Sequence, residues 1–224
     1  MMHNRQKRTR RTRRRLLLIL LLLAVLAVEG GVLRSVLEQR KTDEDWRLVL
    51  VNATHPLTDT EAPELTELYN GVCVDSRIYP DLQAMFDDAR AQGVDPYVRE
   101  GYRTHQAQQE IMDSYIQRFL DQGNSRETAE ALAREYVAEP GTSEHELGLA
   151  VDINARGDSD DWDVYNWLAE HAWDYGFILR YPDGKEDVTG ITYEPWHYRY
   201  VGIEAALEIR EQQVTLEEYL GETP

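Results

Sequence analysis

Apolar residues recur at helical spacing in several stretches of the chain. In residues 79–92 they return every three or four positions, Pro80 suits the first turn of a helix, and Gly93 suits its end. Similar patterns predict helices over residues 104–122, 125–136 and 163–175, and a final helix that starts near Gly202.

Other segments are rich in β-branched and aromatic residues or alternate apolar with polar positions, which predicts strands. These segments are residues 46–51, 94–102, 147–154, 177–181 and 193–201. Predicted helices and strands mix without a regular βαβ repeat. We therefore expect an α+β fold in which a small, mainly antiparallel sheet is flanked by helices.

The longest apolar run, residues 16–28, follows a head of 15 residues that contains eight Lys and Arg and no acid. A basic head before an apolar run predicts that the rest of the chain crosses the membrane and is extracytoplasmic. The run is shorter than the roughly 17–20 residues that a spanning helix needs, but it reaches that length if it continues to residue 33. No clear small-residue cleavage site follows it. We expect residues 16–33 to form a retained membrane anchor, with a cleaved signal segment as the alternative.

Charge and length organise the remainder of the chain. The net charge is −17 overall, but the 16 basic and 41 acidic residues after position 15 give the body −25. Such a body repels nucleic acid, so no nucleic-acid partner is expected and the basic head, residues 1–15, is a topological signal. The polar residues 34–45 are interpreted as a linker, residues 46–212 as one domain, and residues 213–224 as a C-terminal tail.

Residues 143–154 combine a predicted turn and strand around two potential metal ligands. In the strand, Asp152 points away from its apolar neighbours, which share the opposite face. His145 precedes Asp152 by seven residues, too far along a helix for both to reach one ion. A turn at Gly148 would bring the two side chains together.

A second segment, residues 194–197, places Glu194 and His197 three residues apart. His145, Asp152 and His197 together form a set of two histidines and one carboxylate, which is typical of a catalytic zinc site with an open position for water. Zinc lowers the pKa of that water to roughly 7. Glu194, near the set but outside it, can activate the zinc-bound water by taking its proton and then deliver the proton to a departing amine.

These segments resemble the VanY-type D-alanyl-D-alanine carboxypeptidases, a family of zinc peptidases. The family patterns SxHxxGxAxD and ExxH are both complete, and the similarity runs from about Trp46 to Gly202. One small departure is Thr104, where a Ser is frequent. The residues that match the patterns are Ser143, His145, Gly148, Ala150 and Asp152, then Glu194 and His197. The resemblance implies a small antiparallel sheet flanked by helices, of the LAS peptidase and hedgehog type.

The resemblance also implies roles for individual residues. It assigns the same three zinc ligands, Glu194 as the catalytic base, and Arg103 as the group that polarises the scissile carbonyl and stabilises the oxyanion. Gln108 and Ser143 would help to hold the peptide. The charge of Arg103 suits either the substrate's terminal carboxylate or the oxyanion. Trp196 would either support the site from the core or form a wall of the substrate pocket.

We therefore expect a membrane-tethered zinc carboxypeptidase that removes the terminal D-alanine from peptidoglycan stem peptides. An L,D-carboxypeptidase acting on tetrapeptides, or an endopeptidase, would share the metal site and differ in pocket contacts. A non-catalytic, zinc-containing cell-wall binding module is an alternative from another class, although a binder has no need of the base Glu194. A metal-free adhesion or scaffold domain would require all three ligands to be coincidental.

Overall fold

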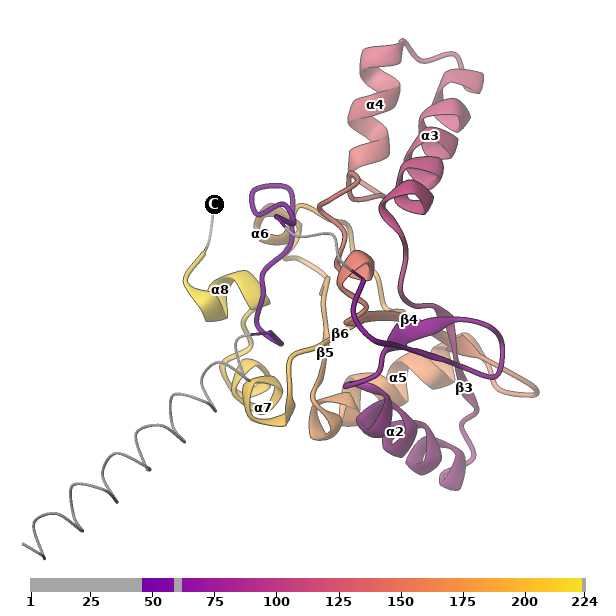
Figure 1. Cartoon of the computed structure of the whole chain (residues 1–224), viewed down its shortest axis with the longest axis vertical. Coiled ribbons are helices and arrows are strands. Elements are labelled where there is room, and N and C mark those ends of the chain that lie inside the picture. Colours follow the sequence, from indigo (N-terminus) through magenta and orange to yellow (C-terminus); the bar gives the residue numbers. More distant parts are fainter. Residues whose placement is uncertain (1–45, 59–61, 223–224) are drawn as a thin grey trace, which may run out of the picture. The chain divides into compact units, whose positions relative to one another are not determined.

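Four short strands form an antiparallel sheet in the order β3-β4-β6-β5 (Figure 1). The computed structural model describes residues 46–58 and 62–222. The strands of the sheet are β3 (Pro96–Glu100), β4 (Ala150–Ala155), β5 (Phe177–Leu179) and β6 (His197–Tyr200), and a separate antiparallel ribbon consists of β1 (Leu65–Glu67) and β2 (Cys73–Asp75). The predicted α+β class with a small antiparallel sheet is confirmed.

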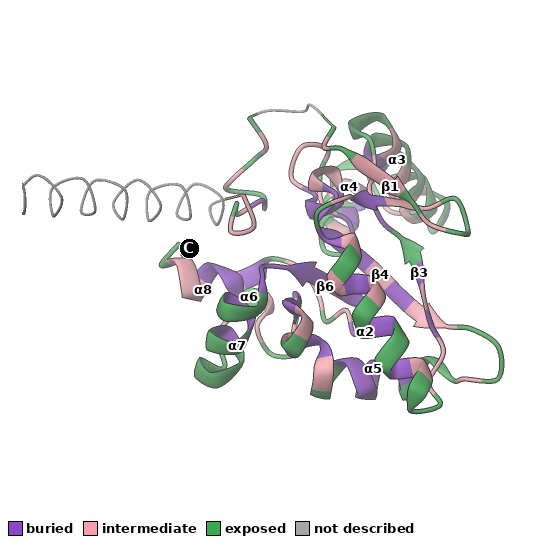
Figure 2. Ribbon diagram, turned by 60° about the horizontal axis from the view of Figure 1, so that its bottom comes forward, coloured by how far each residue is buried: buried purple, intermediate pink, exposed green. Residues whose placement is uncertain are grey.

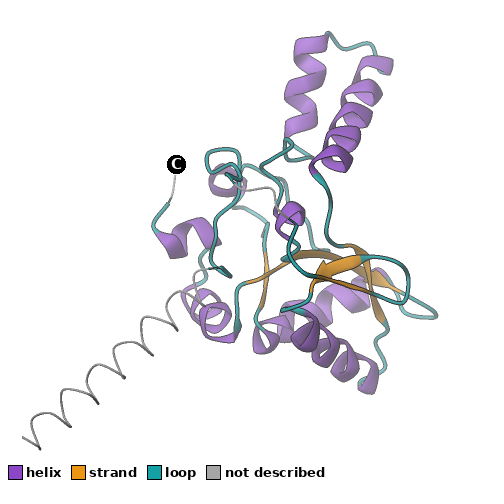
Figure 3. Cartoon of the chain, viewed as in Figure 1, coloured by secondary structure: helices purple, strands orange, loops and turns teal. Residues whose placement is uncertain are grey.

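Helices flank the sheet. They are α2 (Tyr79–Ala91), α3 (His105–Asp121), α4 (Arg126–Arg134), α5 (Asp161–His171), α6 (Glu186–Thr189), α7 (Ile203–Gln212) and α8 (Leu216–Leu220), with short 3-10 turns η1 (Glu144–Leu147) and η2 (Ala172–Tyr175). Helix α2 packs on β3 and α5 on β4 (Figure 2). Helix α7 packs on β5. Helices α3 and α4 pack on each other and project from the sheet as a hairpin (Figure 3).

Local capping sets where the helices begin. The side chains of Thr104 and Ser125 accept backbone N–H groups at the starts of α3 and α4. Asp160 forms a capping box at the start of α5, so this helix begins before residue 163, where the apolar pattern alone had placed it. The apolar stripe predicted for α2 is buried, as expected from its spacing.

The strand predicted over residues 46–51 is wrong. These residues are irregular, and the carbonyl oxygens of Arg47 and Val49 accept hydrogen bonds at 2.9 Å from the guanidinium of Arg199 instead of from a neighbouring strand. Leu48 and Leu50 pack against a buried cluster that contains Ile178. The apolar composition of this segment therefore reflects burial, not strand pairing.

Packing continues past Gln212, where the sequence suggested that a tail begins. Thr215 caps α8 with a capping box, and Leu216 is fully buried. Residues from Arg47 onward form one compact unit that includes α8. The basic head, the apolar segment 16–33 and the linker 34–45 lie outside the described residues. In the part of the chain that is described, no helix is both long and apolar enough to cross a membrane.

Candidate metal centre and active-site pocket

Asp152 and His197 face each other across the strand pair β4–β6, whose register makes them direct partners. Opposite residues of an antiparallel pair project to the same face of the sheet. His197 Nδ1 lies 3.0 Å from Asp152 Oδ1. On the other face, Val151 and Ile153 are fully buried, as the alternation in the sequence predicted. The core-facing residues of β4 thus fix the strand that presents Asp152.

His145 reaches the same place from η1, the turn that precedes β4. Gly148 ends this turn with φ of 72°, a left-handed conformation that glycine adopts easily, so the predicted turn is confirmed. His145 Nε2 then lies 3.4 Å from Asp152 Oδ1, while Nδ1 lies 2.8 Å from the carbonyl oxygen of Gly101. Because a carbonyl oxygen only accepts, Nδ1 donates to it, and Nε2 is the nitrogen that faces Asp152 and is placed to bind a metal.

These three side chains fit a zinc ion. Their ligand atoms lie within 4.8 Å of one another. Within the described part of the chain, His145, Asp152 and His197 form the cluster of His, Cys, Asp or Glu side chains that could hold a metal ion. Asp152 Oδ1 is buried and accepts no hydrogen bond from the described residues, although both imidazoles are close to it. Burial raises the pKa of Asp152, but His145 and His197 outweigh this effect and hold the pKa below its usual range. An ionised carboxylate with two imidazoles is a donor set that zinc prefers.

Glu194 lies at the edge of the ligand set. Its Oε2 is 3.7 Å from His197 Nδ1, and its side chain is 16% exposed. The backbone N–H of His197 donates to the carbonyl of Glu194, which fixes the turn between them. Burial raises the pKa of Glu194 to about 7, against the opposing effects of His197 and Arg103. A carboxylate with a pKa near neutrality is suited to proton transfer at neutral pH.

Arg103 follows β3 and lies beside the same pocket. Its guanidinium donates to Gln108 Oε1 at 2.7 Å and lies 3.5 Å from Glu100 Oε2. The backbone N–H of Arg103 donates to the carbonyl oxygen of His145, so the loop that carries the arginine is bonded to the turn that carries a metal ligand. Arg103 is therefore held in place from both its side chain and its backbone.

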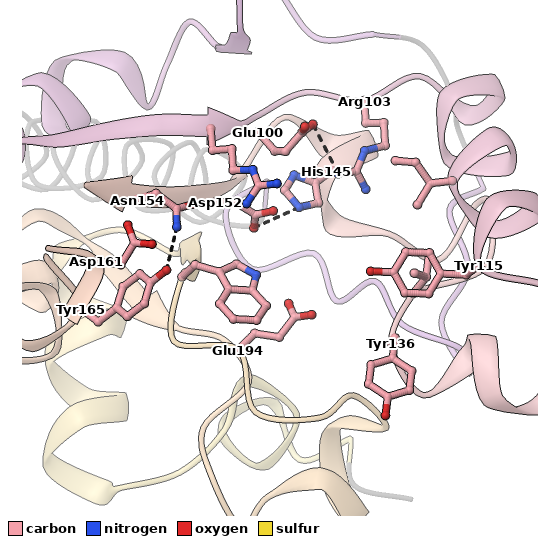
Figure 4. Close-up of a pocket in the computed structure, with 14 residues that line it drawn as sticks. Glu100, Arg103, Tyr115, Tyr136, His145, Asp152, Asn154, Asp161, Tyr165 and Glu194 are labelled. Carbon is pink, nitrogen blue, oxygen red and sulfur yellow. Dashed lines mark hydrogen bonds and ion pairs between the residues drawn. The ribbon is translucent and has the colours of Figure 1, made fainter. Parts of the chain in front are cut away.

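A cavity of about 550 Å³ opens onto these groups (Figure 4). Arg103, His145, Asp152, Glu194 and Trp196 line it. Helix α3 supplies Tyr115 to its wall, and Tyr136 and Val137 come from the segment that follows α4. Asn154, Asp161 and Tyr165 lie across the cavity from these tyrosines. A pocket of this size, with charged groups converging at one end, is suited to a short peptide.

Of the three residues that the sequence predicted to contact the peptide, one lines the cavity and two do not. Trp196 lines the cavity, whereas Gln108 and Ser143 are 1% and 3% exposed and do not contribute to its wall. The amide of Gln108 accepts from Arg103 and donates to the carbonyl oxygen of Ala138 at 2.7 Å. Gln108 therefore lies behind Arg103.

The family follows from a comparison of the whole domain with known proteins. Residues 71–203, which include all three metal ligands, match the sequence profile of VanY, described as D-alanyl-D-alanine carboxypeptidase. The chain belongs to the VanY family. The predicted zinc carboxypeptidase class is thereby confirmed.

Relatives in this family cover most of the chain. A D-alanyl-D-alanine carboxypeptidase of Enterococcus faecalis is 50% identical over 185 residues, which span 82% of this chain and 69% of the relative. A mutant of the vancomycin resistance D,D-pentapeptidase VanY from a VanB-type cassette, in complex with Zn(II), has a TM-score of 0.76 at 53% identity over 78% of this chain and 99% of the other. VanYB in complex with D-alanine-D-alanine gives 0.76 at 52% identity over 79% and 98%.

Sequence reasoning missed one group of residues in this VanY-family site. Behind His197, away from the cavity, lie four buried charged residues, namely Glu144, Arg180, Arg199 and Glu217. The only signal was the position of each arginine, because Arg180 follows the apolar strand β5 and Arg199 stands between aromatic residues in β6. A charged residue within a predicted core strand indicates a buried partner, but the sequence does not name that partner.

Proposed function

We propose that this VanY-family enzyme hydrolyses the terminal peptide bond of peptidoglycan stem peptides and releases D-alanine. The observation that carries the proposal is the placement of Glu194 beside the three-residue ligand set, at the end of a cavity that also contains Arg103. A pure binding module would have no use for a carboxylate held near neutral pKa at the metal site. The likeness to VanYB in complex with D-alanine-D-alanine supports this substrate class.

The ligand set supplies the electrophilic part of the chemistry. A zinc ion held by His145, Asp152 and His197 would leave one position open, polarise the scissile carbonyl and lower the pKa of a water there to about 7. His145 is oriented for this role because its bond to Gly101 occupies Nδ1 and leaves Nε2 facing the other ligands.

Glu194 moves the proton. In its ionised form it takes a proton from the attacking water, whose oxygen forms a bond to the carbonyl carbon. When the carbon–nitrogen bond breaks, Glu194 gives that proton to the nitrogen of the departing D-alanine. One carboxylate serves both steps because burial raises the pKa of Glu194 above that of an ordinary carboxyl, which makes it a better proton acceptor while still able to return the proton.

Arg103 stabilises negative charge in the cavity. Arg103 lines the pocket, and one terminal nitrogen of its guanidinium is held by Gln108. We assign it to the carbonyl oxygen of the scissile bond, where negative charge grows in the transition state. Trp196 forms part of the pocket wall, and Gln108 and Ser143 support the peptide site from behind it.

The substrate is tested by product analysis. Purified zinc-loaded protein is incubated with a stem pentapeptide and, separately, with a tetrapeptide, and released D-alanine is measured by mass. We expect release from the pentapeptide only, with loss of release in Glu194→Gln. Release from the tetrapeptide would instead identify an L,D-carboxypeptidase. Zinc binding without release from either peptide would favour an endopeptidase or a binding module.

We further propose that residues 16–33 tether the enzyme to the membrane, with its catalytic domain on the extracytoplasmic side. The basic head and the apolar run support this topology. The test is fractionation of cells that express the full chain or a variant without residues 1–33. We expect only the full chain in the membrane fraction, and digestion of its domain by protease added to spheroplasts. A full chain found in the soluble extracellular fraction would indicate cleavage of the segment.

A further inference from the structure

A chain of buried ion pairs lies behind the metal site. Arg180 donates from Nε to Glu144 Oε1 at 2.8 Å and holds both carboxylate oxygens of Glu217, at 3.0 and 2.6 Å. Arg199 donates to the same oxygen of Glu144 at 2.7 Å. The four side chains are at most 1% exposed. Burying four charges is expensive even when they are paired, so a buried chain of ion pairs beside an active site is weak evidence of a role in stability alone.

The two oxygens of Glu144 have unequal surroundings. Oε1 accepts from both arginines, whereas Oε2 is buried and accepts no hydrogen bond from any residue the structure describes. Oε2 lies 3.8 Å from Nε2 of His197, and that nitrogen likewise lacks a hydrogen-bond partner within the described ranges. The acceptor and the donor thus face each other, and a movement of about 0.6 Å would complete a hydrogen bond between them.

The other nitrogen of His197 faces the metal site. Nδ1 lies 3.0 Å from Asp152 Oδ1, on the side where His145 also presents Nε2. A histidine that binds a metal through Nδ1 must carry its proton on Nε2, and an acceptor at Nε2 stabilises that tautomer and fixes the ring. Edge contact with His145 and packing on Tyr181 restrict the plane of the ring further.

We propose that Glu144 is a positioning residue for zinc binding: its Oε2 accepts the Nε2 proton of His197 and thereby directs Nδ1 to the metal. The proposal rests on the zinc site described above. Arg180 and Arg199 hold Oε1 and so aim Oε2 at the histidine, while Glu217 neutralises the second positive charge. Glu144 touches neither the substrate nor the reacting atoms.

Glu144→Gln tests this role with nearly the same shape. With its oxygen kept on the two arginines, the new amide would point an N–H group at His197 Nε2 and could not accept the proton. The opposite amide orientation would place an NH₂ group against two guanidinium groups. We therefore expect Glu144→Gln to weaken zinc affinity by about 10–100-fold, measured by competition with a chromogenic chelator.

Glu217→Gln is the matched control. It removes a negative charge from the same buried chain and contacts the same Arg180, but it does not face His197. A merely structural role for the buried charges predicts similar losses of zinc affinity in both variants. The positioning role predicts a loss of zinc affinity in Glu144→Gln only. The zinc affinity of Glu217→Gln should then stay within about threefold of that of the parent protein.

Histidine NMR supplies a readout that needs no variant to fold. In zinc-loaded protein labelled with ¹⁵N at histidine, we expect His197 to carry its proton on Nε2 and to bind zinc through Nδ1. Zinc bound through Nε2, or unchanged zinc affinity in folded Glu144→Gln, would overturn the proposal. Zinc affinity and tautomer are independent of catalysis, so an inactive but zinc-binding protein would reject the proposed function and leave this inference standing.

Discussion

His145 Nδ1 lies 2.8 Å from the carbonyl oxygen of Gly101, so a backbone group decides which nitrogen of this histidine faces the metal. Gly101 leaves no room for a side chain. A methyl group there would overlap the carbonyl oxygen of Cys73 and lie 2.8 Å from Val72 Cγ1. The orientation of one metal ligand therefore depends on a close approach between the end of β3 and the ribbon strand β2.

Gly101→Ala should accordingly reduce both stability and zinc affinity. We expect a loss of about 2–3 kcal/mol in the free energy of unfolding, because the added methyl forces the two backbones apart. Urea unfolding of chelator-treated protein and zinc competition measure the two effects. Gly71→Ala is the control for zinc affinity: a Cβ there meets nothing within 4 Å, so its φ of 83° costs stability through backbone strain but should leave zinc affinity unchanged. An unchanged zinc affinity in Gly101→Ala would show that His145 does not depend on this carbonyl.

The stability of chelator-treated protein should depend on pH through Glu194. Burial raises the pKa of Glu194 to about 7 from its ordinary 4.5, so the folded state binds this proton more tightly than the unfolded state. The stabilisation from this proton is present below pH 4.5 and is lost as the pH rises towards 7. As the pH rises from acid to neutral, the free energy of unfolding of Glu194→Gln should therefore increase by about 1–3 kcal/mol relative to that of the parent protein.

Urea unfolding at pH 5 and pH 8, roughly the two sides of this transition, measures the gain. Glu170→Gln, which removes an exposed carboxylate from α5, is the matched control and should show no such change. A constant difference between Glu194→Gln and the parent protein at both pH values would argue that Glu194 titrates normally.

The activity of the zinc-loaded enzyme should decline in acid through the same residue. Glu194 must be ionised to accept a proton, and the charge of a bound zinc ion lowers its pKa from the value of about 7 that burial produces. We expect the apparent pKa of the acid limb of kcat/KM to lie between 4.5 and 7. Below that pKa, kcat/KM should drop by about tenfold per pH unit. Zinc content is measured at each pH. Constant activity down to pH 4.5, with zinc retained, would exclude Glu194 as the base.

Arg103 and Gln108 should differ in the size of their effects. Arg103→Lys keeps the charge but loses the planar fork of donors, and we expect kcat/KM to fall about 100–1,000-fold while zinc affinity is unchanged. Gln108→Leu leaves Arg103 less restrained and the carbonyl oxygen of Ala138 without its donor, so we expect about a 3–10-fold loss of activity and about 1–3 kcal/mol of stability. An equally large activity loss in Gln108→Leu would indicate direct contact with the peptide.

Zinc should stabilise the folded protein through Asp152. Because the ligands are assembled only in the folded state, a free zinc concentration of 100 times Kd should add about 2.7 kcal/mol to the free energy of unfolding. We expect this gain to be lost in Asp152→Asn, which cannot supply the ionised carboxylate. Thermal unfolding with and without chelator measures it. A full zinc-dependent rise of Tm in Asp152→Asn would place the metal elsewhere.

The sequence predicted best what is local. The alternation around Asp152, the turn at Gly148 and the spacing of Glu194 from His197 each depend on a few neighbouring residues, and the structure reproduces all three. The strand predicted at residues 46–51 failed because its carbonyl groups bond to Arg199, about 150 positions away in the chain. Such a long-range partner overrides local β propensity.

The buried charges behind the site could not be predicted for the same reason. Glu144 appears in the sequence as one acid among 41, and α8 as part of a short acidic tail. Their burial follows from Arg180 and Arg199, which meet them only after the sheet and the helices have packed. The order in which residues occur along the chain does not reveal which opposite charges will meet.

Because Asp152 and His197 are direct partners in the β4–β6 pair, metal binding depends on the register of these two strands. A shift of β4 against β6 by one residue would turn one of the two ligands to the opposite face of the sheet. Only part of the ligand set would then be available to zinc. The binding free energy of zinc therefore stabilises molecules with the correct strand register and not those with a shifted register. Zinc present during refolding should therefore increase the fraction of molecules in which β4 and β6 have the native register.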